Sequence, residues 1–196
     1  MSSDVRFPPS GISIESIQKD AEKTLGIKIT LSGSTDNKIT QLRQAIGSVE
    51  AKKHNEQDVK NLMSRVRVLA GDKLDKADLE RAFRPELQKF IDVFEKYGLH
   101  AKEISDHLKK FDLKDNKIPI TGDLDKDIQQ VEAIMDKINN TSITWIGRGL
   151  SPEMAQFGQR YVTMPDSFIY FLDTFNAAKK ASESQESKSD YKDSKK

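Results

Sequence analysis

Hydrophobic residues recur at intervals of three and four positions along most of the chain, which is the spacing of one side of an α-helix. The most regular series lies in residues 124–138 and comprises Leu124, Ile128, Val131, Met135 and Ile138. Comparable series in residues 14–25, 39–49 and 59–69 predict further helices, and Ile104, Leu108 and Phe111 form a shorter one. The pattern predicts a mainly α protein, α+β at most, built as a compact bundle of seven or eight helices.

Residues that commonly begin or end helices divide this pattern. Asn55 fits the first cap of a helix that stops at Gly71, since asparagine caps helices and glycine terminates them. Ser151 followed by Pro152 is typical of another helix start. These signals give the predicted helices definite bounds.

Two prolines fall inside helical patterns. Pro85 either kinks one helix through residues 75–97 or separates two helices, because proline removes a backbone donor. For the same reason we expect Pro165 to end one helix, with a last helix following it.

Three short segments alternate polar and apolar residues, which is the periodicity of a β-strand. They are residues 27–31, 117–120 and 142–146. We therefore expect a minor sheet of two or three strands beside the helices.

Residues 28–49 and 117–138 repeat the same order of extended segment, turn and helix. Placed one over the other without a gap, they superimpose Gly33 on Gly122. Amphipathic helices align in this way through periodicity alone, so an internal duplication remains a hypothesis. If it holds, we expect the two extended segments to pair as antiparallel strands.

Composition and charge narrow the function classes. The 196 residues include 32 Lys and Arg, 31 Asp and Glu and no Cys, for a net charge of +1. This balance argues against nucleic-acid binding, and the lack of Cys excludes disulfides and thiolate sites. Arg65 and Arg67 are expected on a solvated helix surface. No stretch fits a membrane span or a cleaved signal, so we expect a soluble protein that is cytoplasmic or exported without a cleaved signal peptide.

We expect three regions along the chain. They are a flexible N-terminal segment 1–12, a single helical domain 13–180 and a disordered polyampholyte tail 181–196. A division of the domain into lobes 13–98 and 99–180 is the alternative.

One weak candidate for an anion site lies between a predicted strand and a predicted helix. It comprises Gly147, Arg148, Gly149 and Ser151. Glycines, an arginine and a helix N-terminus suit a phosphate, although a tight capped turn explains the same residues.

A weak candidate for a metal site comprises His100, Glu103 and His107. The three share one side of a helix, but only Glu103 and His107 have the spacing with which two side chains grip one ion. A half-exposed pair of Glu103 and His107 is the commoner outcome for this pattern, and we assign no metal, no cofactor and no catalytic residue.

Aromatic residues crowd the last predicted helix. They are Phe168, Tyr170, Phe171 and Phe175. Residues 168–172 are all apolar or aromatic and so cover more than one side of a helix, which implies burial on two sides or an exposed strip awaiting a partner.

We therefore expect a non-enzymatic protein–protein interaction module that acts through this C-terminal aromatic helix, with another protein or a second copy as partner. One alternative is a bacterial secretion-related protein, either a secreted effector without a signal or a hydrophilic needle-tip or translocator component. The other alternative is a phosphate- or nucleotide-using enzyme centred on residues 147–151.

Overall fold

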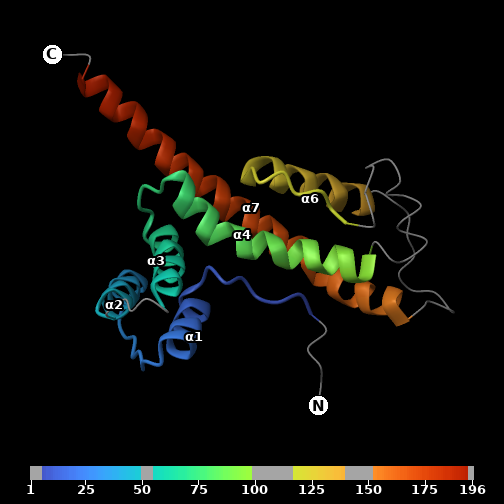
Figure 1. Cartoon of the computed structure of the whole chain (residues 1–196), viewed down its shortest axis with the longest axis horizontal. Coiled ribbons are helices and arrows are strands. Elements are labelled where there is room, and N and C mark those ends of the chain that lie inside the picture. Colours follow the sequence, from blue (N-terminus) through green and yellow to red (C-terminus); the bar gives the residue numbers. More distant parts are fainter. Residues whose placement is uncertain (1–5, 50–54, 99–116, 140–151, 194–196) are drawn as a thin grey trace. The chain divides into compact units, whose positions relative to one another are not determined.

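The structure is a computed structural model of the 196-residue chain. It describes residues 6–49, 55–98, 117–139 and 152–193 (Figure 1). Within these ranges it contains six α-helices and one π-helical turn, and no β-strand. The mainly α prediction is confirmed, and the described part of the chain is all-α.

The chain divides into two compact units, each built from separate stretches. The first, which we call the α6 unit, comprises Met1–Pro8 and Leu87–Ile169. The second, the α1–α3 unit, comprises Pro9–Glu86 and Tyr170–Lys196. Helices α4 (Lys76–Val93) and α7 (Pro152–Asp193) contribute residues to both units. The lobes 13–98 and 99–180 are a different division, which stays a prediction.

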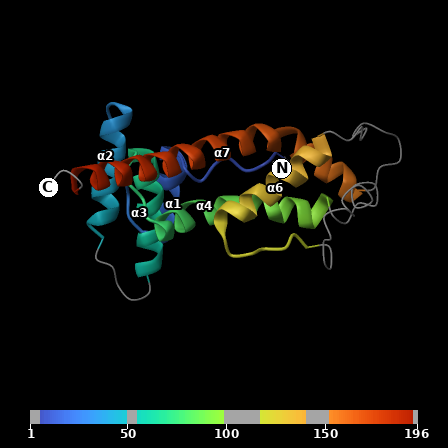
Figure 2. The ribbon, with the colours of Figure 1, turned by 90° about the horizontal axis from the view of Figure 1, so that it is seen from above.

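Three helices form the body of the α1–α3 unit: α1 (Ile14–Leu25), α2 (Thr35–Gly47) and α3 (Glu56–Ala70) (Figures 1 and 2). Their apolar sides meet in a core of Ile17, Ala21, Ile29, Leu42, Ile46, Leu62 and Val66. Burial of each large aliphatic side chain contributes about 1.5–3 kcal/mol. All of them except Ile29, which lies between α1 and α2, are residues that the helical periodicity selects, so the predicted series in this unit are confirmed.

The predicted bounds of α3 are also found. Gly71 follows its last residue with φ = 71°, a left-handed conformation that glycine adopts without strain. Asn55 precedes its first residue, but its side chain makes no capping hydrogen bond.

The two predicted strands that the structure describes, residues 27–31 and 117–120, belong to no helix and form no sheet. That prediction, and their pairing with each other, is wrong for these segments. In each segment a backbone group is hydrogen-bonded to a side chain from a helix of the same unit instead of to another strand. The bonds join Gln18 Nε2 to the Ile29 carbonyl (2.8 Å) and the Ile118 N–H to Glu95 Oε1 (2.9 Å). The third predicted strand, 142–146, lies outside the described residues.

Both internal prolines are accommodated within continuous helices. Pro85 lies inside α4, so it does not separate two helices, and a π-helical turn η1 (Phe94–Gly98) follows α4. Pro165 lies inside α7, so the predicted helix end at this residue is wrong. The neighbouring Met164 and Phe168 are both buried, and their packing holds the helix together where proline removes one hydrogen bond. Merging of these segments lowers the helix number below the predicted seven or eight in the described part, and the short helix around Ile104 lies outside it.

The α6 unit combines α6 (Leu124–Asn139) with an aromatic interior. The predicted series on α6 is confirmed for Leu124, Ile128, Val131 and Met135, which are all buried. Phe157 packs between Phe94 (ring centroids 6.0 Å apart) and Tyr161 (5.4 Å).

The two segments of the proposed duplication begin their helices with the same local geometry. Gly33 and Gly122 have φ values of 91° and 87°. The next residue caps the helix in each case, and its side-chain oxygen accepts a hydrogen bond from the backbone N–H three residues later. The pairs are Ser34 with Asn37 (3.2 Å) and Asp123 with Lys126 (3.1 Å). This agreement extends the sequence similarity to the backbone, and common descent of the two segments stays a hypothesis.

The terminal regions hold more structure than the composition indicates. Of the predicted flexible segment 1–12, the structure describes residues 6–12, in which Phe7 and Ile12 are buried. Of the predicted disordered tail 181–196, the part up to Asp193 belongs to α7. Whether this end of α7 is disordered in solution stays a prediction.

Candidate interaction surface

Three of the four aromatic residues predicted to bind a partner are packed inside the chain. Phe168 meets Phe90 edge to face in the α6 unit, with ring centroids 5.0 Å apart. In the α1–α3 unit, Phe171 and Phe175 pack edge to face on Phe83 at 5.9 and 5.1 Å. All three rings are at most 4% exposed, so in this conformation they are core residues rather than a contact surface. The physical reason is that aromatic rings gain most when their whole surface leaves water.

The fourth predicted contact, Tyr170, is half-exposed. Its hydroxyl donates a hydrogen bond to the Ile12 carbonyl (3.3 Å) within the α1–α3 unit. Tyr170 therefore combines an accessible ring with an internal bond that fixes its direction.

Apart from Tyr170, the exposed hydrophobic side chains described on α7 lie outside the four contact residues that the sequence selects. Val162 and Ile169 are 72% and 56% exposed, and both belong to the α6 unit. They lie seven residues apart, so they share one side of the helix, with the exposed Asp166 between them. We call Val162, Asp166 and Ile169 the α7 strip. The expected break at Pro165 concealed it, because only a continuous helix aligns residues on either side of that proline.

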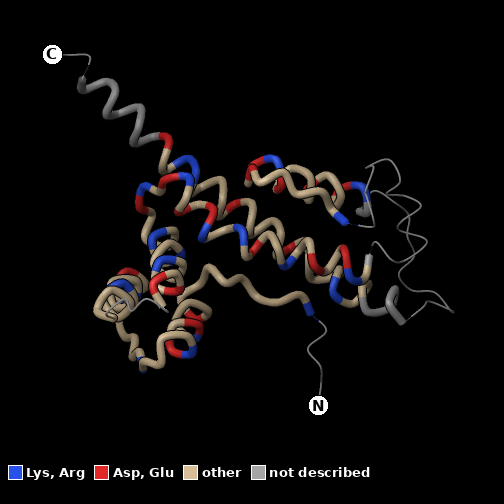
Figure 3. The backbone as a smooth tube through the Cα atoms, in the orientation of Figure 1, with Lys and Arg blue, Asp and Glu red and all other residues tan. Residues whose placement is uncertain are grey.

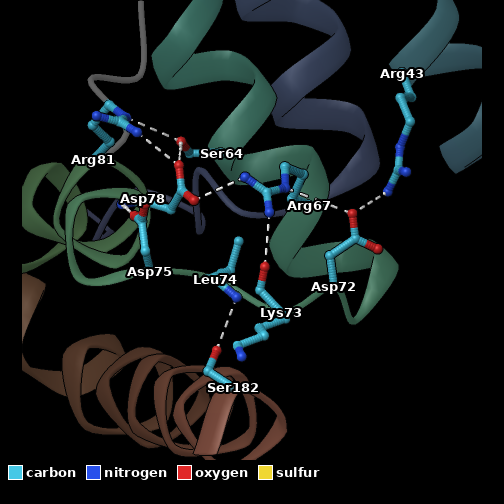
Figure 4. Close-up of polar contacts among 10 residues, drawn as sticks. All are labelled: Arg43, Ser64, Arg67, Asp72, Lys73, Leu74, Asp75, Asp78, Arg81 and Ser182. Atoms are coloured by element: carbon cyan, nitrogen blue, oxygen red, sulfur yellow. Dashed lines mark hydrogen bonds and ion pairs between the residues drawn. The ribbon is translucent and has the colours of Figure 1, made fainter. Parts of the chain in front are cut away.

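A cluster of polar side chains surrounds Asp78, at the start of α4 (Figure 4). Its carboxylate accepts hydrogen bonds from Arg81 Nη2 (2.7 Å), Arg67 Nη1 (2.8 Å) and the Ser64 hydroxyl (3.3 Å). Asp75 caps the helix by accepting the Asp78 N–H (2.8 Å). Asp78 and Ser64 are both buried, so the cluster joins α3 to α4 inside the α1–α3 unit.

The pKa of Asp78 lies below its ordinary value of 3.8. Burial by itself raises this pKa, because it penalises the charged form. The hydrogen bond from Arg81, the charge of Arg67 and a backbone hydrogen bond from Asp75 together outweigh that effect. The carboxylate is therefore held ionised and fully engaged, which suits a structural clamp and not a proton acceptor in catalysis.

The same cluster continues along the turn between α3 and α4. Arg67 donates to the Lys73 carbonyl (2.7 Å) and lies 3.6 Å from Asp72, which pairs with Arg43 of α2 at 2.7 Å. The Leu74 N–H donates to the hydroxyl of the buried Ser182 on α7 (3.0 Å). Residues of α2, α3, α4 and α7 are thus linked around the turn between α3 and α4.

Arg65 and Arg67 are therefore not the solvated helix surface predicted from their neighbours. Arg65 bonds to the Gly11 carbonyl through Nε (2.9 Å) and Nη2, and pairs with Asp20 at 2.8 Å. Only 14% of its side chain is exposed. Both arginines form hydrogen bonds and ion pairs with carbonyl and carboxylate oxygens of the chain itself. These contacts compete with binding to a phosphate backbone.

The remaining charges do not single out a ligand. Lys and Arg alternate with Asp and Glu along the described helices (Figure 3). A groove of about 820 Å³ lies between the outer side of α1 and residues 26–28, and three lysines and two glutamates line it: Lys19, Lys23, Lys28, Glu15 and Glu22. Charges of both signs at an open groove favour neither anions nor cations.

Both ligand sites considered from the sequence fall outside the described residues. These are the anion candidate, Gly147, Arg148, Gly149 and Ser151, and the metal candidate, His100, Glu103 and His107. They stay predictions, as do the enzyme and secretion alternatives. Among the residues that the structure describes, no three acidic or histidine side chains are grouped to hold a metal ion. None of the helices in that part of the chain is long and apolar enough to cross a membrane.

Comparison with known proteins adds no relative. No protein-family model, no curated protein and no solved structure matches the chain. What defines the protein is thus its described architecture, an all-α fold of two units with an exposed apolar strip on its C-terminal helix.

Proposed function

We propose that the chain is a non-enzymatic protein-binding module and that the α7 strip is its contact surface. The observation that carries this proposal is the exposure of Val162 and Ile169, which exceeds that of every other large hydrophobic side chain that the structure describes. Their spacing is that of anchor residues in a helix-to-helix contact. Apolar side chains aligned on one solvated side of a helix mark a surface that gains free energy when a partner covers it.

Asp166 indicates the chemistry of the partner. Its exposed carboxylate stands between the two apolar residues of the strip. The complementary surface is an amphipathic helix with lysine or arginine beside its apolar residues. A second copy is the less suitable partner, because two strips facing each other bring two Asp166 carboxylates together.

The size of the strip sets the strength of binding. Two aliphatic anchors bury little surface compared with a stable interface, and association also costs translational and rotational freedom. We therefore expect weak and reversible binding. The charge of Asp166 contributes selectivity and association rate more than affinity, because it lies at an exposed position.

Two designed helical peptides test the proposal. Both carry the same leucine stripe, which is flanked by lysines in one and by glutamates in the other. Fluorescence anisotropy with the full chain is expected to show binding of the lysine peptide. The affinity for the glutamate peptide is expected to be lower by a factor of about ten or more. Asp166→Asn is expected to narrow the difference between the two peptides.

The matched variants are a double substitution, Val162→Asp with Ile169→Asp, and the control Asn176→Asp at another exposed position of α7. The double variant is expected to lose the lysine peptide, and the control to keep it, with circular dichroism showing that both stay folded. Equal binding by the double variant and the natural chain contradicts the proposed surface.

A further inference from the structure

A second apolar site in the α6 unit is occupied by the chain's own N-terminal segment. The ring of Phe7 stacks on Phe90 of α4, with centroids 4.4 Å apart and planes 20° from parallel. Phe90 in turn meets Phe168 of α7 edge to face at 5.0 Å. The Phe7 N–H donates to Thr163 Oγ1 at 2.8 Å. We call Phe90, Thr163 and Phe168 the aromatic slot.

The way Phe7 fills the slot is that of a bound peptide. Residues 6–9 belong to no helix or strand, and Phe7 is the one buried side chain among them, at 7% exposure. Arg6 and Pro9 on either side are exposed, and Pro8 is half-buried. One inserted ring and one backbone hydrogen bond to a side chain are the contacts by which grooves recognise short extended segments.

The two prolines suit this mode of binding. Pro8 and Pro9 have fixed φ angles, so the segment behind Phe7 is already extended before it docks. Little conformational entropy is therefore lost on docking. The loss is equally small for any other segment in which proline follows an aromatic residue.

We propose that the aromatic slot binds an extended segment of a partner protein in which proline follows an aromatic residue, and that Phe7 occupies the slot as an internal competitor. The N-terminal segment, which we call the arm, shows what such a ligand needs. It needs a flat ring to stack on Phe90, a backbone N–H to donate to Thr163, and a proline after the aromatic residue. A partner can bind only when the N-terminal segment leaves the slot. The apparent affinity is therefore the intrinsic affinity multiplied by the fraction of chains whose slot is open. This site is separate from the α7 strip and does not depend on the function proposed above.

A capped, fluorescent peptide with the sequence of residues 6–10, Arg-Phe-Pro-Pro-Ser, is the probe. Anisotropy is measured with the natural full chain and with Phe7→Ala, which empties the slot. We expect the variant to bind the probe at least about tenfold more tightly than the natural chain, because the internal competitor is gone. A control peptide with alanine in place of its phenylalanine is expected to bind neither chain. Thr163→Ala, combined with Phe7→Ala, is expected to weaken probe binding several-fold.

A second measurement covers the case in which Phe7→Ala does not fold. Because the chain has no Cys, Arg6→Cys places a single fluorophore on the exposed residue beside Phe7 in an otherwise natural sequence. Excess unlabelled probe peptide is expected to displace the arm and lower the anisotropy of this fluorophore, whereas the alanine peptide leaves it unchanged. A folded Phe7→Ala chain that does not bind the probe overturns the proposal, and so does a labelled arm that no concentration of probe displaces.

Discussion

Replacement of Asp78 by asparagine tests how much the buried ion cluster contributes to stability. Asparagine keeps the shape and one acceptor oxygen but removes the charge that Arg67 and Arg81 face at 2.8 and 2.7 Å. The arginine side chains remain 33% and 29% exposed, so water partly compensates them after the change. We therefore expect a loss of about 2–3 kcal/mol in the free energy of unfolding at pH 7, below the 3–5 kcal/mol of a fully buried pair.

The stability that Asp78 contributes is expected to depend on pH. Because the pKa of Asp78 is lowered by folding, its contribution is present above the ordinary value of 3.8 and is lost as the pH falls below it. Urea unfolding followed by circular dichroism at pH 7 and at several pH values below 3.8 follows this loss. The difference between the natural chain and Asp78→Asn is expected to shrink as the pH falls through the lowered pKa of Asp78, because the carboxylate of the folded chain is then protonated.

Asp72→Asn is the matched control. Asp72 also pairs with two arginines, Arg43 at 2.7 Å and Arg67 at 3.6 Å, but its side chain is 32% exposed and that of Arg43 is 43% exposed. We expect a cost of at most about 1 kcal/mol for this variant. Equal costs for the two variants, or a cost of Asp78→Asn that does not change with pH, would refute the argument that burial and pairing of Asp78 set its contribution.

Three further predictions concern α7. Phe171→Asp is expected to cost about 4 kcal/mol or more and to reduce the helical circular dichroism signal, because it buries a charge in a packed ring cluster, whereas Ile169→Asp stays within about 0.5 kcal/mol. Pro165→Ala is expected to stabilise the chain by about 1–3 kcal/mol in thermal unfolding, since alanine restores the donor for the Tyr161 carbonyl. Burial, with a smaller effect of Asp136, raises the pKa of Tyr161 above its ordinary value of 10.0, so the part of the ultraviolet titration that Tyr161→Phe removes is expected to lie above pH 10. Stability is then expected to fall as the pH rises above about 10, and Tyr161→Phe to flatten that fall.

Helix positions and core residues of the described part were accessible from the sequence because they depend on local periodicity. The series through Leu124 and Met135 in α6, and through Leu42 and Ile46 in α2, needs no knowledge of the neighbouring helices. The strand prediction failed at Ile29 for a related reason. Alternation of apolar residues shows that one side is buried, but a sheet also needs a second strand, and here the side chain of Gln18 takes the carbonyl.

The candidate surface was harder to predict because exposure depends on long-range packing. Phe171 and Ile169 look equally apolar in the sequence, yet one packs on Phe83 and the other lies in solvent. The aromatic slot was missed for the same reason, since nothing near Phe7 in the sequence indicates that Phe90 will stack on it. The proline pair beside Phe7 was the available signal, and it was interpreted as a mark of flexibility.

The two similar segments show where local information ends. After Gly33 and after Gly122, the same turn and the same capping bond begin a helix, because glycine and a capping side chain act within four residues. Beyond the caps the helices enter different units: Leu42 joins the core of α1 and α3, whereas Val131 is buried in the unit that holds the aromatic slot. Equivalent local sequences can therefore serve different surroundings, and a function assigned to this chain has to be tested on the residues that those surroundings expose.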